Sequence, residues 1–68
     1  MENKIIDASH QSWEADARDL LERGAEFAVL NPPQASRRVL IRLAMEFDYW
    51  LVQVRKGRGT NFSFWPKG

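Results

Sequence analysis

The sequence of 68 residues contains no cysteine and a single histidine, His10. Without cysteine there is neither a disulfide framework nor thiolate chemistry, and one histidine leaves too few ligands for a His/Cys metal site. The longest apolar runs, such as Val39-Leu40-Ile41, are far too short to cross a bilayer, and no signal peptide is visible. We therefore expect a cytoplasmic protein with no membrane segment, no metal and no cofactor.

The composition is that of a folded globular chain. Hydrophobic residues make up 44% of the sequence and charged residues 28%, which is typical of globular and not of disordered proteins. A chain of this length forms one domain, residues 1–68, with one small core. The net charge is only +1, but residues 1–31 carry three basic and seven acidic side chains, whereas residues 32–68 carry seven basic and two acidic ones. This asymmetry indicates either a basic binding face or attraction between the two halves of one domain.

Only four glycines and three prolines interrupt the chain, and two apolar stripes with helical spacing lie between these breaks. The first stripe predicts a helix that starts at Ser12 and ends before Gly24, and the second predicts a helix from about Pro33 to Phe47. The first stripe consists of Trp13, Ala17, Leu20 and Leu21. The second consists of Val39, Leu40, Leu43, Ala44 and Phe47.

Four short segments are predicted to be strands: residues 4–8, 25–30, 49–55 and 60–65. The last two are joined by the turn Lys56-Gly57-Arg58-Gly59 and should form an antiparallel hairpin. The first two, joined through a helix, should be parallel. The predicted fold is an α+β two-layer β-α-β-α-β-β sandwich, with a four-stranded mixed sheet and two helices on one face.

In the third strand, alternation places Trp50, Val52 and Val54 on one face and Tyr49 and Leu51 on the other. We predict that Val52 and Val54 turn toward the core. Tyr49, Leu51 and Trp65 would then lie on the open face of the sheet, the face that the helices do not cover. A face this apolar indicates a partner surface or a dimer. The predicted core comprises Trp13, Leu20, Leu21, Phe27, Val29, Leu40, Leu43, Val52, Val54, Phe62 and Phe64.

The element order, the length and the segment from Ile5 to Trp13 resemble the small TusA/SirA-type sulfur-carrier domains. In those domains the first strand ends in an aspartate, and a Cys-Pro pair opens the first helix. Here Asp7 matches the aspartate, Ser12 falls on the cysteine position and Trp13 falls on the proline position. Further matches along the chain are Gly24, Asn31-Pro32 and the closing Phe62-Ser63-Phe64.

This resemblance implies a fold whose sulfur-transfer cysteine is absent. The family carries sulfur as a persulfide on a thiol activated by a helix N-terminus, and a serine hydroxyl cannot do this. We therefore expect a degenerate, non-catalytic member that binds an unknown protein partner; we assign no catalytic residue. Ser12 is either natural or a laboratory substitution, and Trp13 favours natural divergence. From the residues alone, Ser12 is most simply a helix N-cap, Asp7 a turn residue and Trp13 a core residue. Ser12 and His10 lack a third member for nucleophilic catalysis.

Basic side chains provide the alternative function. They cluster on the second helix and at the hairpin tip, where together with nearby aromatic residues they could hold phosphates and stack bases. The element order is also similar to that of the C-terminal domain of translation initiation factor 3, which binds ribosomal RNA. However, the isoelectric point of about 8.2 is lower than expected of a nucleic-acid module. Nucleic-acid binding is therefore the alternative to partner binding, and we expect a monomer or a weak homodimer. The candidate phosphate contacts are Arg37, Arg38, Arg42, Arg55, Lys56 and Arg58.

Overall fold

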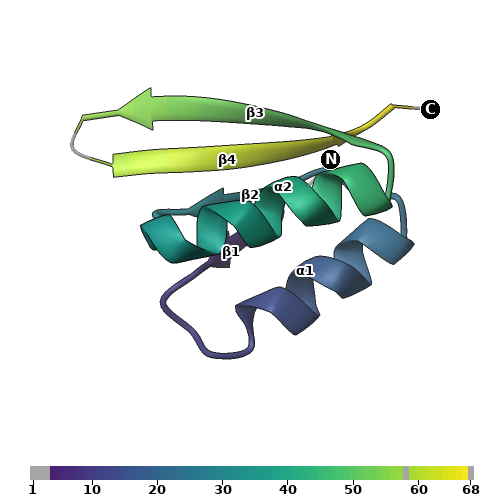
Figure 1. The fold of residues 1–68 in the computed structure, drawn as a ribbon, viewed down its shortest axis with the longest axis horizontal. Helices are drawn as coiled ribbons and strands as arrows, with labels where there is room; N and C mark the ends of the chain where they lie inside the picture. Colours follow the sequence, from purple (N-terminus) through teal and green to yellow (C-terminus); the bar gives the residue numbers. More distant parts are fainter. Residues whose placement is uncertain (1–3, 58, 68) are drawn as a thin grey trace.

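A computed structural model describes residues 4–57 and 59–67, which form one sheet with two helices packed on one face (Figure 1). The element order confirms the predicted α+β, β-α-β-α-β-β fold. In chain order the elements are β1 (Lys4–Asp7), α1 (Trp13–Glu22), β2 (Phe27–Leu30), a 3₁₀ turn (Gln34–Ser36), α2 (Arg37–Glu46), β3 (Tyr49–Lys56) and β4 (Gly59–Pro66).

The four strands lie in the order β1-β2-β4-β3. β1 and β2 are parallel, as predicted for two strands joined through a helix, and β3 and β4 form the predicted antiparallel hairpin. β4 also pairs antiparallel with β2, which places it in the interior of the sheet. β1 and β3 are therefore the two edge strands.

The C-terminus of α1 follows the prediction closely. Gly24 has a φ of +70°, the left-handed conformation that glycine adopts at low cost. Its N–H donates to the Leu21 carbonyl at 3.1 Å, and the Ala25 N–H donates to the Leu20 carbonyl at 3.0 Å. This pair of bonds satisfies carbonyls that the helix end leaves open and turns the chain directly into β2.

The second helix begins later than the sequence predicts. Pro33 stays extended, with a ψ of 152°, and its carbonyl accepts the Ser36 N–H at 2.9 Å. This i→i+3 bond closes a 3₁₀ turn, and regular α-helix starts only at Arg37. The helix ends at Glu46, and Asp48, with a φ of +58°, reverses the chain into β3.

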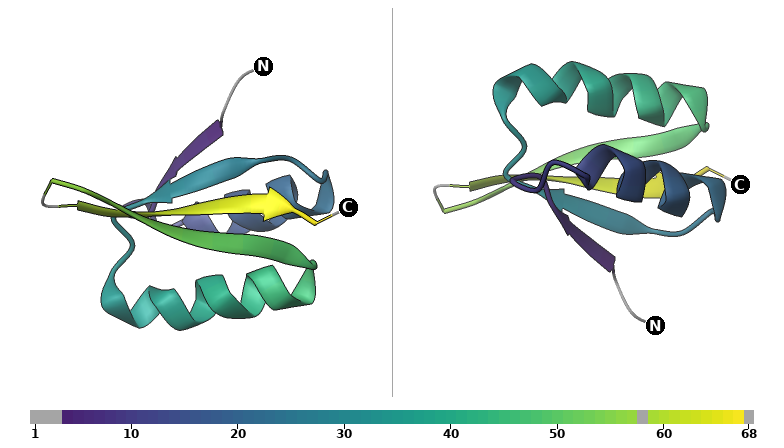
Figure 2. Two further views of the ribbon diagram at one scale, coloured as in Figure 1. Left: turned by 90° about the horizontal axis from the view of Figure 1, so that it is seen from above. Right: turned by 90° about the horizontal axis from the view of Figure 1, so that it is seen from below.

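One hydrophobic core lies between the helices and the sheet. The sheet is strongly twisted, with α2 nearest β3 and α1 nearest β1 (Figure 2). Phe27 of β2 and Phe64 of β4 stack at the centre, with ring centroids 4.6 Å apart. The buried hydrophobic residues are Ile6, Ala8, Ala17, Leu20, Leu21, Phe27, Val29, Leu40, Leu43, Ala44, Tyr49, Phe62 and Phe64.

The predicted facing of β3 is wrong. Tyr49 is buried and Leu51 packs against the core, whereas Val52 is 48% exposed and Val54 is only half-buried. The cause is the register with β4, in which Leu51 lies opposite the core residue Phe64. Residues directly opposite one another share a face of the sheet, so Val52 and Val54 must point away from the helices.

Candidate functional site

The turn between β1 and α1 contains the residues to which the sulfur-carrier resemblance points. Asp7 ends β1, and its carboxylate accepts a hydrogen bond from the Ser9 backbone N–H at 3.0 Å. This bond, with a smaller contribution from the Ser9 hydroxyl, holds the pKa of Asp7 below its ordinary value of 3.8. The Asp7 carbonyl also accepts the His10 N–H at 3.2 Å. Asp7 therefore builds the turn that leads the chain toward α1.

Ser12 occupies the N-cap position of α1, where its carbonyl accepts the Asp16 N–H at 3.1 Å. The Ser12 hydroxyl makes no capping hydrogen bond, and the backbone ψ of 9° is not the extended conformation that side-chain capping favours. The predicted helix boundary is right, but the predicted side-chain cap is not formed. Trp13 is the first helical residue and packs half-buried against the core. Glu14 and Asp16 add negative charge to the first turn.

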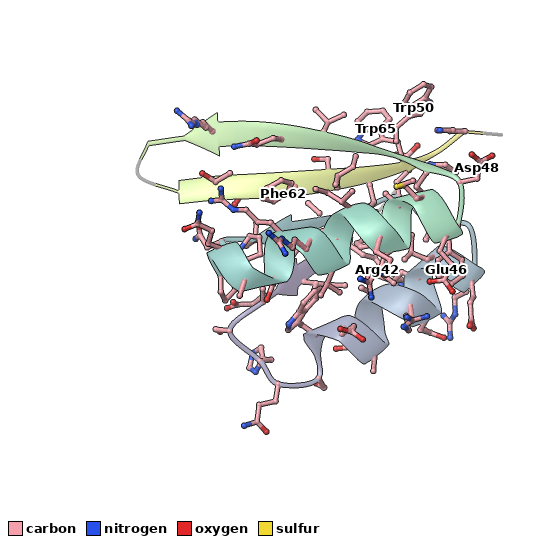
Figure 3. All side chains as sticks on the ribbon, in the orientation of Figure 1. Arg42, Glu46, Asp48, Trp50, Phe62 and Trp65 are labelled. Atoms are coloured by element: carbon pink, nitrogen blue, oxygen red, sulfur yellow. The ribbon has the colours of Figure 1, made fainter. Side chains whose placement is uncertain are left out.

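Two of the predicted phosphate contacts share a shallow groove between the helices. Arg38 and Arg42 of α2 line this groove together with Arg18 of α1, and its volume is about 780 Å³. Arg18 is partly neutralised, because its guanidinium lies 3.6 Å from the Glu46 carboxylate and 3.9 Å from that of Glu14. The remaining lining residues are Ile41, Met45 and Glu46. Figure 3 shows Arg42 and Glu46 on the side of α2 that faces α1.

Two further predicted phosphate contacts, Arg37 and Arg55, do not line this groove. The Arg37 guanidinium lies over the ring of Phe62, 5.7 Å from its centroid, and the buried Nε has no hydrogen-bond partner among the described residues. Arg55 lies on β3 opposite Thr60. The Lys56 side chain and the whole of Arg58 fall outside the described part of the chain. Of the four candidates whose side chains the structure describes, only Arg38 and Arg42 thus line the same groove.

Exposed apolar side chains gather on the face of the sheet turned away from the helices, which we call the open face. Trp50 of β3 and Trp65 of β4 lie directly opposite one another, and they are 59% and 51% exposed (Figure 3). Val52 lies two residues farther along the same face, and Ile5 of β1 is 63% exposed. The registers place Ile5, Ala28, Ser63 and Val52 in one row across the sheet. The open face thus carries apolar side chains at both edge strands, with Ala28 and Ser63 between them.

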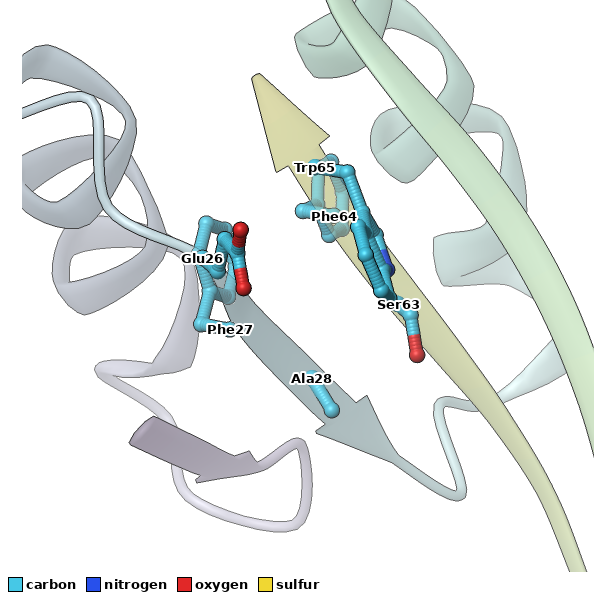
Figure 4. A pocket seen from close by; sticks show the side chains of 6 residues that line it. All are labelled: Glu26, Phe27, Ala28, Ser63, Phe64 and Trp65. Carbon is cyan, nitrogen blue, oxygen red and sulfur yellow. The ribbon is translucent and has the colours of Figure 1, made fainter. Parts of the chain in front are cut away.

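A small hollow interrupts this face between β2 and β4. Its volume is about 120 Å³, and it forms where the small side chains of Ala28 and Ser63 lie opposite one another (Figure 4). The Glu26 carboxylate lies on one side of the hollow and the Trp65 ring on the other. A negative charge beside an aromatic face is a suitable place for a cationic side chain, because both groups attract positive charge.

The charges nearest the tryptophan pair largely compensate one another. The Lys67 ammonium lies 4.6 Å from the centroid of the Trp50 ring and 3.5 Å from the Asp48 carboxylate. Lys67 therefore covers part of Trp50 while its charge is balanced by Asp48. Beside the hollow, the carboxylate of Glu26 contributes a further negative charge.

The sequence predicts Trp65 on the open face, but it does not predict Trp50, Val52 or the hollow there. A signal for them was present in the sequence. The predicted turn pairs Lys56 with Gly59, and counting back from that pair puts Leu51 opposite Phe64. Because Phe64 belongs to the predicted core, the same count places Trp50 and Val52 on the open face.

Comparison of the chain with protein-family models, with curated proteins and with solved structures finds no match. Among the described residues, no three or more histidine, aspartate or glutamate side chains are grouped so that they could hold a metal ion. The described helices are too short or too polar to span a bilayer.

Proposed function

We propose that this chain is a non-catalytic, sulfur-carrier-like domain of the cytoplasm that acts by binding a protein partner through the open face of its sheet. The observation that supports partner binding is the exposed cross-strand pair Trp50–Trp65, on an apolar face that continues to Ile5. Large aromatic side chains gathered on one exposed face are typical of protein interaction sites. The sulfur-carrier-like part of the proposal rests on the sequence resemblance around Asp7 and Ser12.

The charges of the open face define the partner further. With Lys67 balanced by Asp48, the carboxylate of Glu26 is left beside the hollow and the Trp65 ring. The partner should therefore present an apolar surface that carries a lysine or arginine. The aliphatic part of that side chain would cover Ala28 and Trp65, and its charged end would meet Glu26.

A nucleic acid is the alternative ligand, and it would have to use a different surface. Phosphate groups gain nothing from the Glu26 carboxylate, so the groove lined by Arg18, Arg38 and Arg42 is the candidate for nucleic-acid binding. The two ligands differ in their response to salt. Phosphate binding weakens steeply as the ionic strength rises, whereas apolar docking does not.

Capture from a lysate of the source cells tests the proposal if each capture is compared with matched variants. The native chain, Trp65→Ser and Ile41→Ser are immobilised in parallel. Ile41 is a suitable control because it is 52% exposed, nearly the same as Trp65, but lies in the groove between the helices. We expect a protein that the native chain and Ile41→Ser both retain at high salt and that Trp65→Ser loses.

Two results would overturn the proposal. One is the capture of the same proteins by all three chains, which would show that the open face is not used. The other is the retention of nucleic acid alone, released by salt and lost on Arg38→Gln and Arg42→Gln substitution. Glu26→Gln then tests the chemistry of the partner, because it removes the negative charge and leaves the apolar face intact. If the partner presents a lysine or arginine there, this variant should capture less of it.

A further inference from the structure

The free edge of β3 is the longest unpaired strand edge among the described residues. β3 has eight residues, whereas the other edge strand, β1, has four. β3 is the outermost element at its side of the sheet, and both helices lie below it in Figure 1. The view onto this edge in the left panel of Figure 2 shows no helix lying across it. Long edges of this kind are templates for pairing with another strand.

The hydrogen bonds of Thr60 reveal which groups of β3 point outward. The Thr60 N–H donates to Asn31 Oδ1 at 3.1 Å, and the Thr60 carbonyl accepts the Asn31 N–H at 3.1 Å. Thr60 thus directs both backbone groups toward β2, so its opposite residue on β3, Arg55, must direct its own toward the free edge. Because antiparallel pairs alternate in this respect, Tyr49, Leu51 and Gln53 point outward as well.

These four outward residues are complementary to a second copy of themselves. An antiparallel pair of β3 strands related by a two-fold axis at Val52 places Leu51 opposite Gln53 of the second copy, and Tyr49 opposite Arg55. Every outward N–H and carbonyl of the four then finds a partner. If the register shifts by two residues in either direction, Tyr49 or Arg55 lies opposite a residue beyond the ends of β3. The register centred on Val52 is thus the one that uses the whole outward set.

The open-face side chains fit the same register. Val52 would lie against Val52 of the second copy, and each Trp50 would lie opposite a Val54. Pairs of an aromatic with a β-branched side chain stabilise antiparallel strands, and like charges directly opposite destabilise them. Here Arg55 faces Tyr49 and not another arginine, and Val52, 48% exposed in the single chain, would gain an apolar neighbour.

We propose that β3 pairs with β3 of a second copy of this chain, antiparallel and about a two-fold axis at Val52, joining two four-stranded sheets into one. An isologous contact of this kind closes on itself and gives a dimer, not a fibre. The side chains used by the edge and by the hollow beside Glu26 differ, so this pairing does not depend on the partner proposed above.

Single cysteines introduced into this cysteine-free chain test the register directly. At the two-fold axis the Val52 Cα atoms would be about 4.5 Å apart, as in other non-hydrogen-bonded antiparallel pairs. That distance lies within the range of a disulfide. Val54→Cys is the matched control, because its two copies would be four residues apart along the strands, on the order of 13 Å.

Mild oxidation of Val52→Cys should therefore yield a covalent dimer of twice the 7.9 kDa chain mass, at least tenfold more than Val54→Cys yields under the same conditions. Equal cross-linking of both variants, or none in either, would overturn the proposal. The cross-linking result does not depend on whether Trp65→Ser loses its partner. Either proposal can therefore fail while the other holds.

Sedimentation equilibrium gives a second measurement without new disulfides. The native chain should show an average mass that rises with concentration above the monomer value. Val52→Lys should remain monomeric over the same range, because it places two ammonium groups side by side at the axis. Ile5→Lys, which changes an apolar residue of the open face that is 63% exposed at the far edge of the sheet, should behave as the native chain does. A native chain that stays monomeric at the highest concentration, or a Val52→Lys chain that still dimerises, would contradict the pairing.

Discussion

The hydroxyl of Tyr49 lies 3.0 Å from the carbonyl oxygen of Ala25 and donates a hydrogen bond to it. The same hydroxyl is 3.4 Å from the carbonyl of Leu21, which belongs to the last turn of α1. The first residue of β3 is thereby joined to the point where α1 ends and β2 begins. The ring of Tyr49 is buried against Phe27 and Phe64, so the residue supplies both packing and a polar contact.

Replacing Tyr49 with phenylalanine should remove the hydrogen bond and keep the packing. We expect the free energy of unfolding to fall by about 1 kcal/mol, the usual net contribution of one such bond. Urea unfolding of the two proteins measures the difference. Leu51→Ala on the same strand is a useful comparison, since it removes packing and no hydrogen bond. No change in stability for Tyr49→Phe would show that the hydroxyl gains no more from these carbonyls in the folded chain than from water in the unfolded chain.

The burial of Tyr49 also predicts a dependence of stability on pH. Desolvation raises the pKa of its hydroxyl above the ordinary value of 10.0. The folded chain thus favours the protonated form, so this contribution to stability is complete below the unfolded pKa and is lost as the pH rises through the folded one. The unfolding free energy should decrease above about pH 10 more steeply in the native chain than in Tyr49→Phe. Because the chain has a single tyrosine, tyrosinate absorbance reports its ionisation directly.

The burial of Tyr49 is a feature of the fold that apolar spacing does not predict. The helices, the strand order along the chain and most of the core followed from apolar spacing. The faces of β3 did not, because Trp50, Val52 and Val54 form the more uniformly apolar side. The structure puts Tyr49 inside, where its hydroxyl meets the carbonyls of Leu21 and Ala25, a tertiary contact that no periodicity reveals. The register of the hairpin decides the matter, and it depends on the turn and not on hydrophobicity.

Substitutions in α2 and β3 separate the observed core from the predicted one. Leu43 is 1% exposed, and Leu43→Ala should lower the unfolding free energy by about 2–5 kcal/mol. Val52, which the sequence placed in the core, is 48% exposed, and Val52→Ala should cost less than about 1 kcal/mol. Thermal or urea unfolding at low protein concentration, where any dimer dissociates, measures both. Equal losses at the two positions would contradict the observed facing of β3.

The contact between Asn31 and the start of β4 predicts a specific effect of a small substitution. A Cβ atom added at Gly59 would lie 2.6 Å from Asn31 Oδ1, the atom that accepts the Thr60 N–H. Gly59→Ala should therefore displace the Asn31 side chain and destabilise the fold by about 1 kcal/mol, the value of the lost hydrogen bond.

Asn31→Gly provides the control for this contact. Glycine tolerates the φ of +46° at position 31 but has no side-chain oxygen to displace. In the Asn31→Gly background, Gly59→Ala should cost clearly less than it does alone. Additive losses in the double variant would mean that the alanine acts through the hairpin and not through Asn31.

The candidate site was predictable only in part. The turn role of Asp7 and the helix boundary at Ser12 are local features, fixed by residues close in sequence. The open face combines β1, β2, β3 and β4, and its hollow exists because Ala28 and Ser63 happen to lie opposite one another. Such a pairing depends on the order of strands in the sheet, which the spacing of apolar residues does not encode.

The position of Ser12 predicts the behaviour of a thiol placed there. Ser12 is exposed at the N-cap of a helix of ten residues, where unpaired N–H groups and the helix dipole stabilise negative charge. A Ser12→Cys variant should have a thiol pKa below the unperturbed value of about 8.5. Glu14 and Asp16 in the first turn act in the opposite direction, so the lowering should be modest. The rate of alkylation as a function of pH measures this pKa.

Gln11→Cys is the matched reference for this thiol, because residue 11 is also exposed but lies before the helix. A pKa for Ser12→Cys equal to or above that of Gln11→Cys would mean that the helix N-terminus does not act on this position. Acceptance of sulfur is a separate property, measured by intact mass after incubation with a persulfide donor. We expect poor loading, because the sequence resemblance aligns Trp13 with the proline of the sulfur-carrier domains. Efficient loading would instead show that a thiol at position 12 is sufficient for sulfur acceptance even with Trp13 beside it.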